Sequence, residues 1–540
     1  MIKKIFIESN DDERTRALKL ILDIEKIPYF YIEEAELKDL ETSLFLLTSR
    51  IDIKANHKIL FNPELLNRPL KVNQTEPLKL KININKILDV LKEFNLNEEV
   101  EIPNVSVYKE VDFYSEEPLS KILIDKTEYN AISRDKNSIY FFFDILPLFV
   151  HLISEDYFEK TVEKNVLSNG LLDKVYKLIP YNLRLYIYKK YYKEVHKELE
   201  NTTDFKTNFP VDATGFVLLE LIKYTILLQT DLATINKWPY YYNYATLITH
   251  DTEPTKFSYT KGLSILLDKL DEHKIKSTVT LVGNYVQYIS RENIERLKNH
   301  DIGCHGMYHD RKFLLIPNYE KKVRLENAKR ILEKVFNREI NFFRAPTLER
   351  PSSLFELLEE KEYKYDSSII DVQREQPFCG KGNSFYLPFY PIVKNRKSKI
   401  LELPISAPDC ISPYFFGYSM EKTLEFFKEK LKFIEKVNGL GVFIVHTPAW
   451  GLKDAENRVT LLEFLINNTK NSWVTTLKGV TKWWETRNNL VLEFTDNKLY
   501  LINNNNFELE DLKIKLENRE NQVKEFQIAK ILPNERMIVK

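Results

Sequence analysis

From about residue 244 onward, the apolar and polar positions alternate between short buried strands and amphipathic helices. Leucines recur at helical spacing within residues 259–273, at Leu263, Leu266, Leu267 and Leu270. The apolar run STVTLVG follows at 277–283, and the same order returns with a helix near 320–336 before the strand INFFRAP, and with a long helix before the strand GVFIVH. Repeated strand and helix units in one region predict a parallel sheet, open or closed into a barrel.

The pattern changes along the chain, and these changes predict four regions. Residues 1–130 alternate apolar runs with helical segments and lack a glycine-rich phosphate loop, so we expect an α/β domain of unassigned role. Residues 131–240 are predicted to be a mainly helical connecting region, and residues 241–487 the barrel. Residues 488–540 alternate apolar and polar positions between asparagine-rich turns, which predicts a small antiparallel β module.

Composition narrows the classes of partner. The 540 residues include 79 lysines and arginines and 79 acidic residues, so the chain has no overall basic footprint for nucleic acid. No apolar stretch is long and uncharged enough for a membrane span. Three cysteines are too few for a disulfide framework, and the N-terminal apolar run is too short for a signal peptide. We therefore expect a cytoplasmic protein of undetermined oligomeric state.

Polar residues stand at the ends of successive predicted strands in the barrel region. They are Asp251 and Glu253 in THDTE, His305 and His309 in GCHGMYHD, Arg344 in FRAP, and His446 in FIVHTPAW. In parallel α/β folds, functional side chains collect where strands end, because the loops there vary around a rigid scaffold. Two imidazoles and one carboxylate form a facial ligand set that leaves positions open for water and substrate. The order of these residues indicates a metal site with acid and base groups beside it.

The motifs in this region resemble those of a known family. Residues 244–488 are similar to the NodB-like polysaccharide deacetylases, carbohydrate esterase family 4, whose motifs are an aspartate-rich strand end, H-[ST]-x-x-H, R-x-P and a late strand ending in histidine. The passages LELPIS and VTKWWETRN, and the lead-in WPYYYNYATLITHD, look like those of the T-H-D-x-[DE] subgroup with an N-terminal extension. The resemblance implies a distorted (β/α) barrel and a divalent metal, with zinc as the expected ion. It also implies hydrolysis of an N-acetyl or related amide on a carbohydrate substrate.

The resemblance also implies roles for individual residues. Glu253, His305 and His309 would bind the metal, and Asp251 would be the general base. Residues i and i+2 of a strand share one side, which is compatible with Asp251 and Glu253 facing the same pocket, whereas His250 would point away and pack.

Three further residues complete the implied site. Arg344 would hold Asp251 ionised and oriented, and His446 would deliver a proton to the departing amine. Asp366 in YDSS is the candidate for tuning His446, with Asp371 next.

Three features depart from the family pattern or allow a different interpretation. Gly306 stands where a serine or threonine is usual after the first histidine, and Thr347 and Leu348 follow R-x-P where an aromatic residue is frequent. Cys304 precedes the first histidine and could bind a soft metal, although a small buried thiol is the simpler interpretation.

Two alternatives stay open at this point. The same barrel could hydrolyse a small non-peptide C–N bond, and a smaller, more closed pocket would favour that reading. An inactive glycan-binding protein is the alternative from another class, but a pure binder has no need of a base, a metal set and an acid together.

Overall fold

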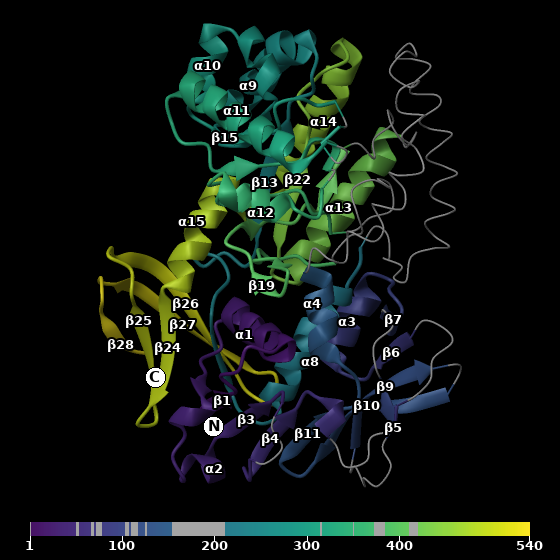
Figure 1. Ribbon diagram of the computed structural model, residues 1–540, viewed down its shortest axis with the longest axis vertical. Helices are drawn as coiled ribbons and strands as arrows, with labels where there is room; N and C mark the ends of the chain where they lie inside the picture. The colour runs from purple at the N-terminus through teal and green to yellow at the C-terminus, as the bar shows by residue number, and fades with distance from the viewer. Residues whose placement is uncertain are drawn as a thin grey trace.

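The computed structural model describes residues 2–49, 53–65, 70–71, 78–102, 107–109, 117–124, 127–153, 211–310, 312–313, 316–348, 350–371, 384–409 and 419–539. Residues 154–210, which form much of the predicted helical connecting region, lie outside the described residues, as do Cys379 and Cys410. Figure 1 shows a barrel above and a separate mixed sheet below, with helices α1 (Glu13–Glu25) and α4 (Ile145–Ile153) between them.

The N-terminal sheet combines a parallel half and an antiparallel half. The strand order is β2-β1-β3-β4-β11-β10-β9-β6-β7. The parallel half consists of β1 (Ile5–Ile7), β2 (Phe30–Tyr31), β3 (Leu44–Leu47), β4 (His57–Leu60) and β11 (Ser138–Phe141). The antiparallel half consists of β6 (Leu78–Ile82), β7 (Glu99–Ile102), β9 (Glu117–Ile124) and β10 (Thr127–Asp135). Strand β11 joins the two halves, because it pairs parallel with β4 and antiparallel with β10.

Helices cover this sheet and contact the barrel. Besides α1 and α4 they are α2 (Asp39–Thr42), α3 (Asn85–Glu93) and α8 (Thr214–Leu227). Helix α1 begins where Asp12 accepts a hydrogen bond from the Thr15 backbone N–H at 2.9 Å, which satisfies one of the unpaired donors of its first turn. Phe149 on α4 makes an edge-on contact with Phe385 of the barrel region, with ring centroids 5.6 Å apart. The N-terminal sheet and the barrel therefore share packed apolar surface.

The barrel is a curled sheet of parallel strands. Along the sheet the order is β20-β17-β16-β15-β14-β13-β22-β21, with β23 also paired to β13. The strands are β13 (Ala245–Asp251), β14 (Thr278–Leu281), β15 (Asp301–Cys304), β16 (Phe342–Phe343), β17 (Tyr365–Asp366), β20 (Leu401–Glu402), β21 (Ala407–Pro408), β22 (Leu440–Ile444) and β23 (Trp473–Val474). Every residue of the central strands β13, β14 and β22 is buried, as expected for parallel strands covered on both faces.

One extended segment brings the two edges of this curled sheet together. Residues 401–408 pair with β17 through β20 and with β22 through β21. Between these strands Ile405 forms a further parallel bridge with Ile370. The expected mixed α/β fold with a distorted (β/α) barrel is therefore confirmed. Several of its strands are only two residues long, so they carry less periodic signal than the helices between them.

Helices follow most of the barrel strands. They are α9 (Leu263–Glu272), α10 (Arg291–Leu297), α11 (Asn318–Phe336), α12 (Leu354–Glu360), α13 (Met420–Lys436), α14 (Leu452–Asn468) and α15 (Leu477–Asn488). The four leucines that predicted a helix over 259–273 all face the core, on α9. A π-helical turn at Ser258–Gly262 precedes α9, so the regular α-helix begins at Leu263 rather than at the predicted residue 259. In the part of the chain that the structure describes, no helix has the length and apolarity needed to cross a membrane.

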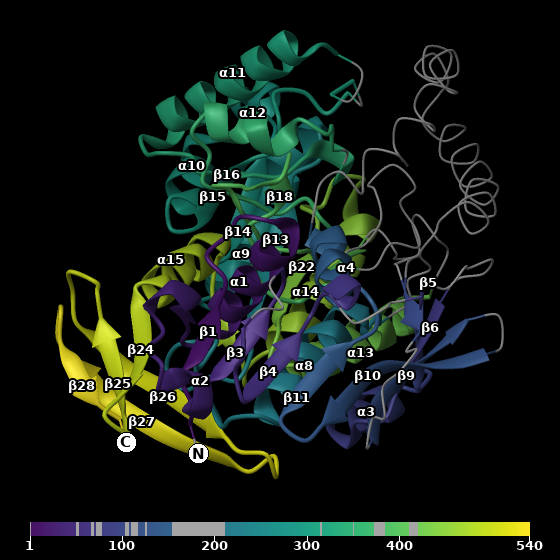
Figure 2. The same ribbon diagram turned by 60° about the horizontal axis from the view of Figure 1, so that its bottom comes forward.

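The C-terminal strands form two antiparallel sheets, one of which includes a strand from before the barrel. The first sheet contains β24 (Leu490–Thr495), β25 (Lys498–Asn503) and β28 (Arg536–Ile538). The second contains β26 (Leu509–Glu517) and β27 (Val523–Ile531), and β26 also pairs with β12 (Leu232–Ile235). Figures 1 and 2 show these strands beside α1 and β1, so the two ends of the chain lie close together.

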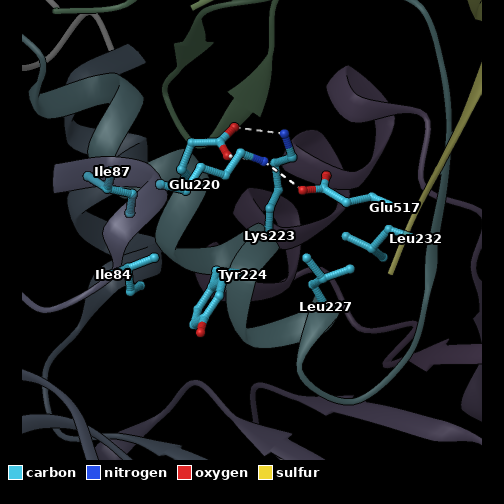
Figure 3. Close-up of a pocket in the computed structure, with 9 residues that line it drawn as sticks. Ile84, Ile87, Glu220, Lys223, Tyr224, Leu227, Leu232 and Glu517 are labelled. Atoms are coloured by element: carbon cyan, nitrogen blue, oxygen red, sulfur yellow. Dashed lines mark hydrogen bonds and ion pairs between the residues drawn. The ribbon is translucent and has the colours of Figure 1, made fainter. Parts of the chain in front are cut away.

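A buried group of charges ties these parts together. Glu25 at the end of α1 pairs with Lys223 at 3.2 Å and with Lys237 at 3.0 Å. Figure 3 shows the continuation of this group on α8, where Lys223 also pairs with Glu220 at 2.7 Å, beside Glu517 of β26. Because each buried charge has an opposite partner, removing one member leaves another unpaired in a medium that solvates it poorly.

We predict that Arg487→Leu strongly destabilises the fold. Arg487 is 1% exposed and donates hydrogen bonds to the carbonyls of Ile24, Ile235 and Asn236, which joins α1, β12 and α15. Leucine leaves all three carbonyls without this donor, so the free energy of unfolding should fall by roughly 3 kcal/mol in denaturant titrations. Lys482→Leu, on the exposed face of the same helix, is the control. Equal stability of the two variants would contradict the prediction.

Candidate active site

Asp251 ends strand β13 with its side chain inside the barrel. It is 3% exposed, and its Oδ1 accepts hydrogen bonds from the Thr280 hydroxyl at 2.7 Å and from Arg344 Nη1 at 2.9 Å. Burial alone would raise the pKa of this carboxyl group, but the Arg344 guanidinium and the nearby His305 together hold the pKa well below its usual range. Asp251 is therefore an ionised carboxylate with one oxygen fixed by two donors.

Arg344 is fully buried and spans three strands. It follows β16 and donates through Nη1 to the Thr249 hydroxyl at 2.8 Å, in addition to Asp251. Its Nε and Nη2 donate to the carbonyl and the hydroxyl of Ser367, both at 2.8 Å. The guanidinium can donate to all these acceptors in one orientation only. It therefore fixes the position of the Asp251 carboxylate and also stabilises its charge.

His305 and His309 lie side by side at the mouth of the barrel. His305 extends β15, with its backbone N–H bonded to the Leu281 carbonyl at 2.9 Å and its ring Nδ1 2.9 Å from the Arg344 carbonyl. Nδ1 must donate in that contact, which leaves Nε2 with a free lone pair. Burial lowers the pKa of His305 to about 4, so the ring is neutral near pH 7. The ring centroids of His305 and His309 are 5.3 Å apart.

His446 follows β22, the strand next to β13, and is held by a carboxylate. Its Nδ1 lies 2.5 Å from Asp409 Oδ1, and its backbone N–H donates to Asp409 Oδ2 at 2.8 Å. Burial disfavours a charged imidazole, but Asp409 outweighs that effect and raises the pKa of His446 to about 9. The other ring nitrogen, Nε2, lies 3.6 Å from Glu253 Oε1.

Asp409 is the residue that the sequence reasoning missed, and Asp366 does not take its place. Asp409 directly follows β21, and Arg458 of α14 donates to its Oδ2. The rule that polar residues at strand ends carry function applies to this position, but the two-residue strand β21 gave too weak a pattern for the rule to be used. The expectation that Asp366 tunes His446 is corrected, because Asp409 makes that contact.

Asp366 instead lies on the other side of Arg344, among buried polar groups. It accepts a hydrogen bond from the Ser368 hydroxyl at 2.9 Å and faces Glu402, which accepts from the backbone N–H groups of Ser368 and Ile369 at 3.1 and 2.8 Å. Burial raises the pKa of both carboxyl groups, because two negative charges cannot share an apolar site. Burial therefore favours the protonated form of these two carboxyl groups.

The surroundings of three other residues indicate a structural role. Asp371, the second candidate for tuning His446, forms a fully buried ion pair with Lys430 at 2.8 Å. His250 is fully buried and contacts the Val445 carbonyl through Nδ1 at 2.6 Å, as expected for packing. Cys304 is fully buried and burial raises the pKa of its thiol to about 11, so it is not a thiolate near pH 7.

The loop conformation explains why residue 306 is a glycine. Gly306 has φ of +75°, a region that side chains with a Cβ rarely adopt. A Cβ there would also lie 3.0 Å from Cγ of Pro346. A serine or threonine at this position would strain the loop between the two histidines. The turn after Arg344 is strained as well, since Thr347 and Leu348 have φ of 55° and 56°.

The donor types around His305 fit a divalent cation. The two neighbouring imidazoles offer neutral nitrogen donors, and Glu253 offers an ionised carboxylate, since His309 and His446 lower its pKa against the opposing effect of burial. Two imidazoles and a carboxylate are a common set for zinc and other first-row metals. Among the described residues, however, no group of three His, Cys, Asp or Glu side chains is placed so that it could hold a metal ion, and Glu253 is turned toward His446.

Comparison with known proteins shows which family part of this chain resembles. Residues 245–365 match the family model described as polysaccharide deacetylase, so this part of the chain is similar to that family. The match contains Asp251, the two site histidines and Arg344, but it ends before Asp409 and His446. No curated protein matches the chain.

Solved structures with a similar arrangement cover somewhat less than half of this chain. A Mycobacterium smegmatis protein assigned as a polysaccharide deacetylase has 20% identity over 46% of this chain and 92% of its own, with a TM-score of 0.38. PuuE allantoinase has 14% identity over 46% and 92%, with a TM-score of 0.37. BA3943 from Bacillus anthracis, a family 4 pseudoenzyme, has 14% identity over 44% and 64%, with a TM-score of 0.29.

We predict that Glu402→Gln changes how stability depends on pH. A carboxyl group with a raised pKa binds its proton more tightly in the folded protein, so the wild-type free energy of unfolding falls as pH rises above about 4 and through the folded pKa. Glutamine can keep the backbone hydrogen bonds of Glu402 and donate its amide to Asp366 without taking up a proton.

The variant should therefore gain stability relative to wild type as the pH rises above about 5 in urea titrations. Glu425→Gln, on the exposed face of α13, is the control and should follow the wild-type curve. Parallel curves for wild type and Glu402→Gln would show that folding does not raise the pKa of Glu402.

Proposed function

We propose that this protein is a metal-dependent amide hydrolase that removes an N-acetyl or related acyl group from an amino sugar or a polysaccharide precursor. One observation carries the proposal. Two polar pairs, Asp251 with Arg344 and His446 with Asp409, stand at the carboxyl ends of the neighbouring strands β13 and β22, beside the paired imidazoles of His305 and His309. Amide hydrolysis needs a group that accepts a proton and another that donates one, and these pairs are suited to those two roles.

His305, His309 and Glu253 would hold the metal, with zinc as the expected ion. A bound divalent cation polarises an acyl oxygen and makes water more acidic. Asp251 accepts the proton of the attacking water, while Arg344 keeps the carboxylate ionised and aimed into the site. Thr280 and Arg344 both donate hydrogen bonds to Oδ1 of Asp251. Oδ2 of Asp251 is therefore the oxygen that we assign to accepting the proton of the water.

His446 has the complementary role in this proposal. Its Nδ1 contacts Asp409, so its Nε2 is the nitrogen that can deliver a proton to the departing amine. Asp409 is itself fixed by Arg458, which also donates to Asp454 at 2.8 Å. Asp454 in turn accepts from the backbone N–H groups of Ala449 and Trp450, in the loop that follows His446. This network sets the orientation of the imidazole.

We predict that Asp251→Asn and His305→Ala remove acetate release from N-acetylated sugars and oligosaccharides. Asparagine cannot accept the proton, so kcat should fall by roughly 10² to 10⁴. His305→Ala removes a metal donor, and a chelator should have the same effect on wild type, with activity restored by added zinc. Asp496→Asn, in the exposed β24–β25 turn, is the control.

The outcomes of this experiment separate the competing functions. Turnover that survives the chelator and both substitutions would remove the proposed mechanism. Release of product only from small non-sugar amides would favour hydrolysis of a small C–N bond. Zinc bound to wild type without any turnover would favour a glycan-binding protein.

We also predict that Asp409→Asn lowers kcat by at least about tenfold with little change in KM, since a positioned proton donor contributes catalysis rather than binding. The substitution weakens the contact that orients His446 and the one that Arg458 makes. Steady-state kinetics on the same substrate measure the two constants separately. A wild-type kcat in a folded Asp409→Asn variant would contradict the positioning role.

A further inference from the structure

The second histidine of the proposed metal site stands on a loop. His305 extends β15 and is fixed through both its backbone and its ring, whereas His309 lies four residues further on, half-buried, between β15 and α11. A cation that needs both imidazoles would have to order this loop on binding unless the loop is already held, and ordering flexible backbone costs free energy.

The first part of the loop is tied to the neighbouring connection by its backbone. The N–H of Gly283 donates to the Gly306 carbonyl at 2.9 Å, and the N–H of Asn284 donates to the Met307 carbonyl at 3.2 Å. These bonds fix the chain as it leaves His305, but they end two residues before His309.

Among the described residues, Arg324 of α11 contacts the second part of the loop. Its Nη1 lies 3.1 Å from both carboxylate oxygens of Asp310, and its guanidinium lies over the Tyr308 ring, 5.0 Å from the centroid. Glu320, one turn earlier on α11, accepts from Nη2 at 2.8 Å and thereby orients the guanidinium. Arg324 thus contacts the residue on each side of His309.

We propose that Arg324 is a positioning residue that holds His309 within reach of His305, an inference that rests on the proposed function. A planar guanidinium can pair with a carboxylate through one edge and stack on an aromatic ring through its face, which a lysine ammonium cannot do. Because Gly306 offers no side chain to brace the loop, the brace comes from the helix that follows it.

The exposed fraction of the partners of Arg324 distinguishes a positioning role from a purely structural one. The side chains of Asp310 and Glu320 are 29% and 38% exposed, and ion pairs at such positions contribute little to overall stability. The loss of Arg324 should therefore be seen in the affinity for a divalent cation more than in the melting temperature.

The experiment compares Arg324→Gln, Arg324→Lys and wild type in the full-length, metal-free protein. Zinc affinity is measured by competition with a chromophoric chelator, and thermal unfolding is followed on the same samples without metal. Arg324→Gln should weaken zinc binding roughly tenfold or more, as substitutions behind metal ligands commonly do. Arg324→Lys should recover only a small part of the loss, and both melting temperatures should stay close to that of wild type.

Arg330→Gln is the matched control. Arg330 lies on the same helix, and the same charge is removed, but its guanidinium contacts Asn327 at 3.4 Å on the exposed side of α11 rather than the loop. This variant should bind zinc like wild type. Asp310→Asn removes the ion pair from the other side and keeps the Oδ1 that accepts from the Lys312 N–H, so it replaces Arg324→Gln if that variant does not fold.

The results distinguish this inference from the function on which it rests. Wild-type zinc affinity in Arg324→Gln or Asp310→Asn, with affinity lost in His309→Ala, overturns the positioning role and leaves the proposed function standing. A fall in affinity that is matched by a lower melting temperature shows general destabilisation and also overturns it. Absence of zinc binding by wild type overturns the proposed function, and the inference with it.

Discussion

The buried Arg344 guanidinium is the contact on which the arrangement of the barrel interior depends. It reaches Thr249 and Asp251 on β13 and Ser367 after β17, so it joins strands on both sides of β15. A charge with no exposed surface is costly unless every donor is used and an opposite charge is adjacent, and Asp251 supplies that charge. The ion pair with Asp251 therefore offsets the cost of burying Arg344, and it also keeps the carboxylate at the end of β13 ionised.

The segment at 401–408 has a comparable effect on the other half of the site. Because it pairs with β17 at its start and with β22 at its end, it brings Asp409 beside the residue that follows β22, His446. The family match covers the strands that carry Asp251, both site histidines and Arg344, while the second pair comes from the strands that close the barrel. The segment that closes the sheet therefore also completes the site.

The sequence predicted the elements with strong periodicity and missed those defined by long-range contacts. The leucine spacing of α9 and the apolar run of β22 were enough to indicate the parallel α/β barrel, and the strand-end rule selected Asp251, His305, Arg344 and His446. The sequence could not show whether Asp366 or Asp409 contacts His446, because Asp366 ends a two-residue strand and Asp409 follows another. The contact is decided by residues 401–408, which close the sheet and place Asp409 beside His446. The roles of Glu253 and His309 in metal binding stay predictions.

Titratable groups that lie close together in the site have different protonation states, because each has a different neighbour. Asp251 stays ionised because a guanidinium outweighs its burial, and His305 stays neutral because burial outweighs the nearby Asp251, while the Arg344 carbonyl fixes its tautomer. The Asp409 carboxylate has the opposite effect on His446 and favours the imidazolium. For Asp366 and Glu402, burial outweighs the attraction of the nearby Arg350, so the pKa of each carboxyl group is raised. The charge state of each group therefore depends on which charged partner lies beside it and on whether that partner outweighs burial.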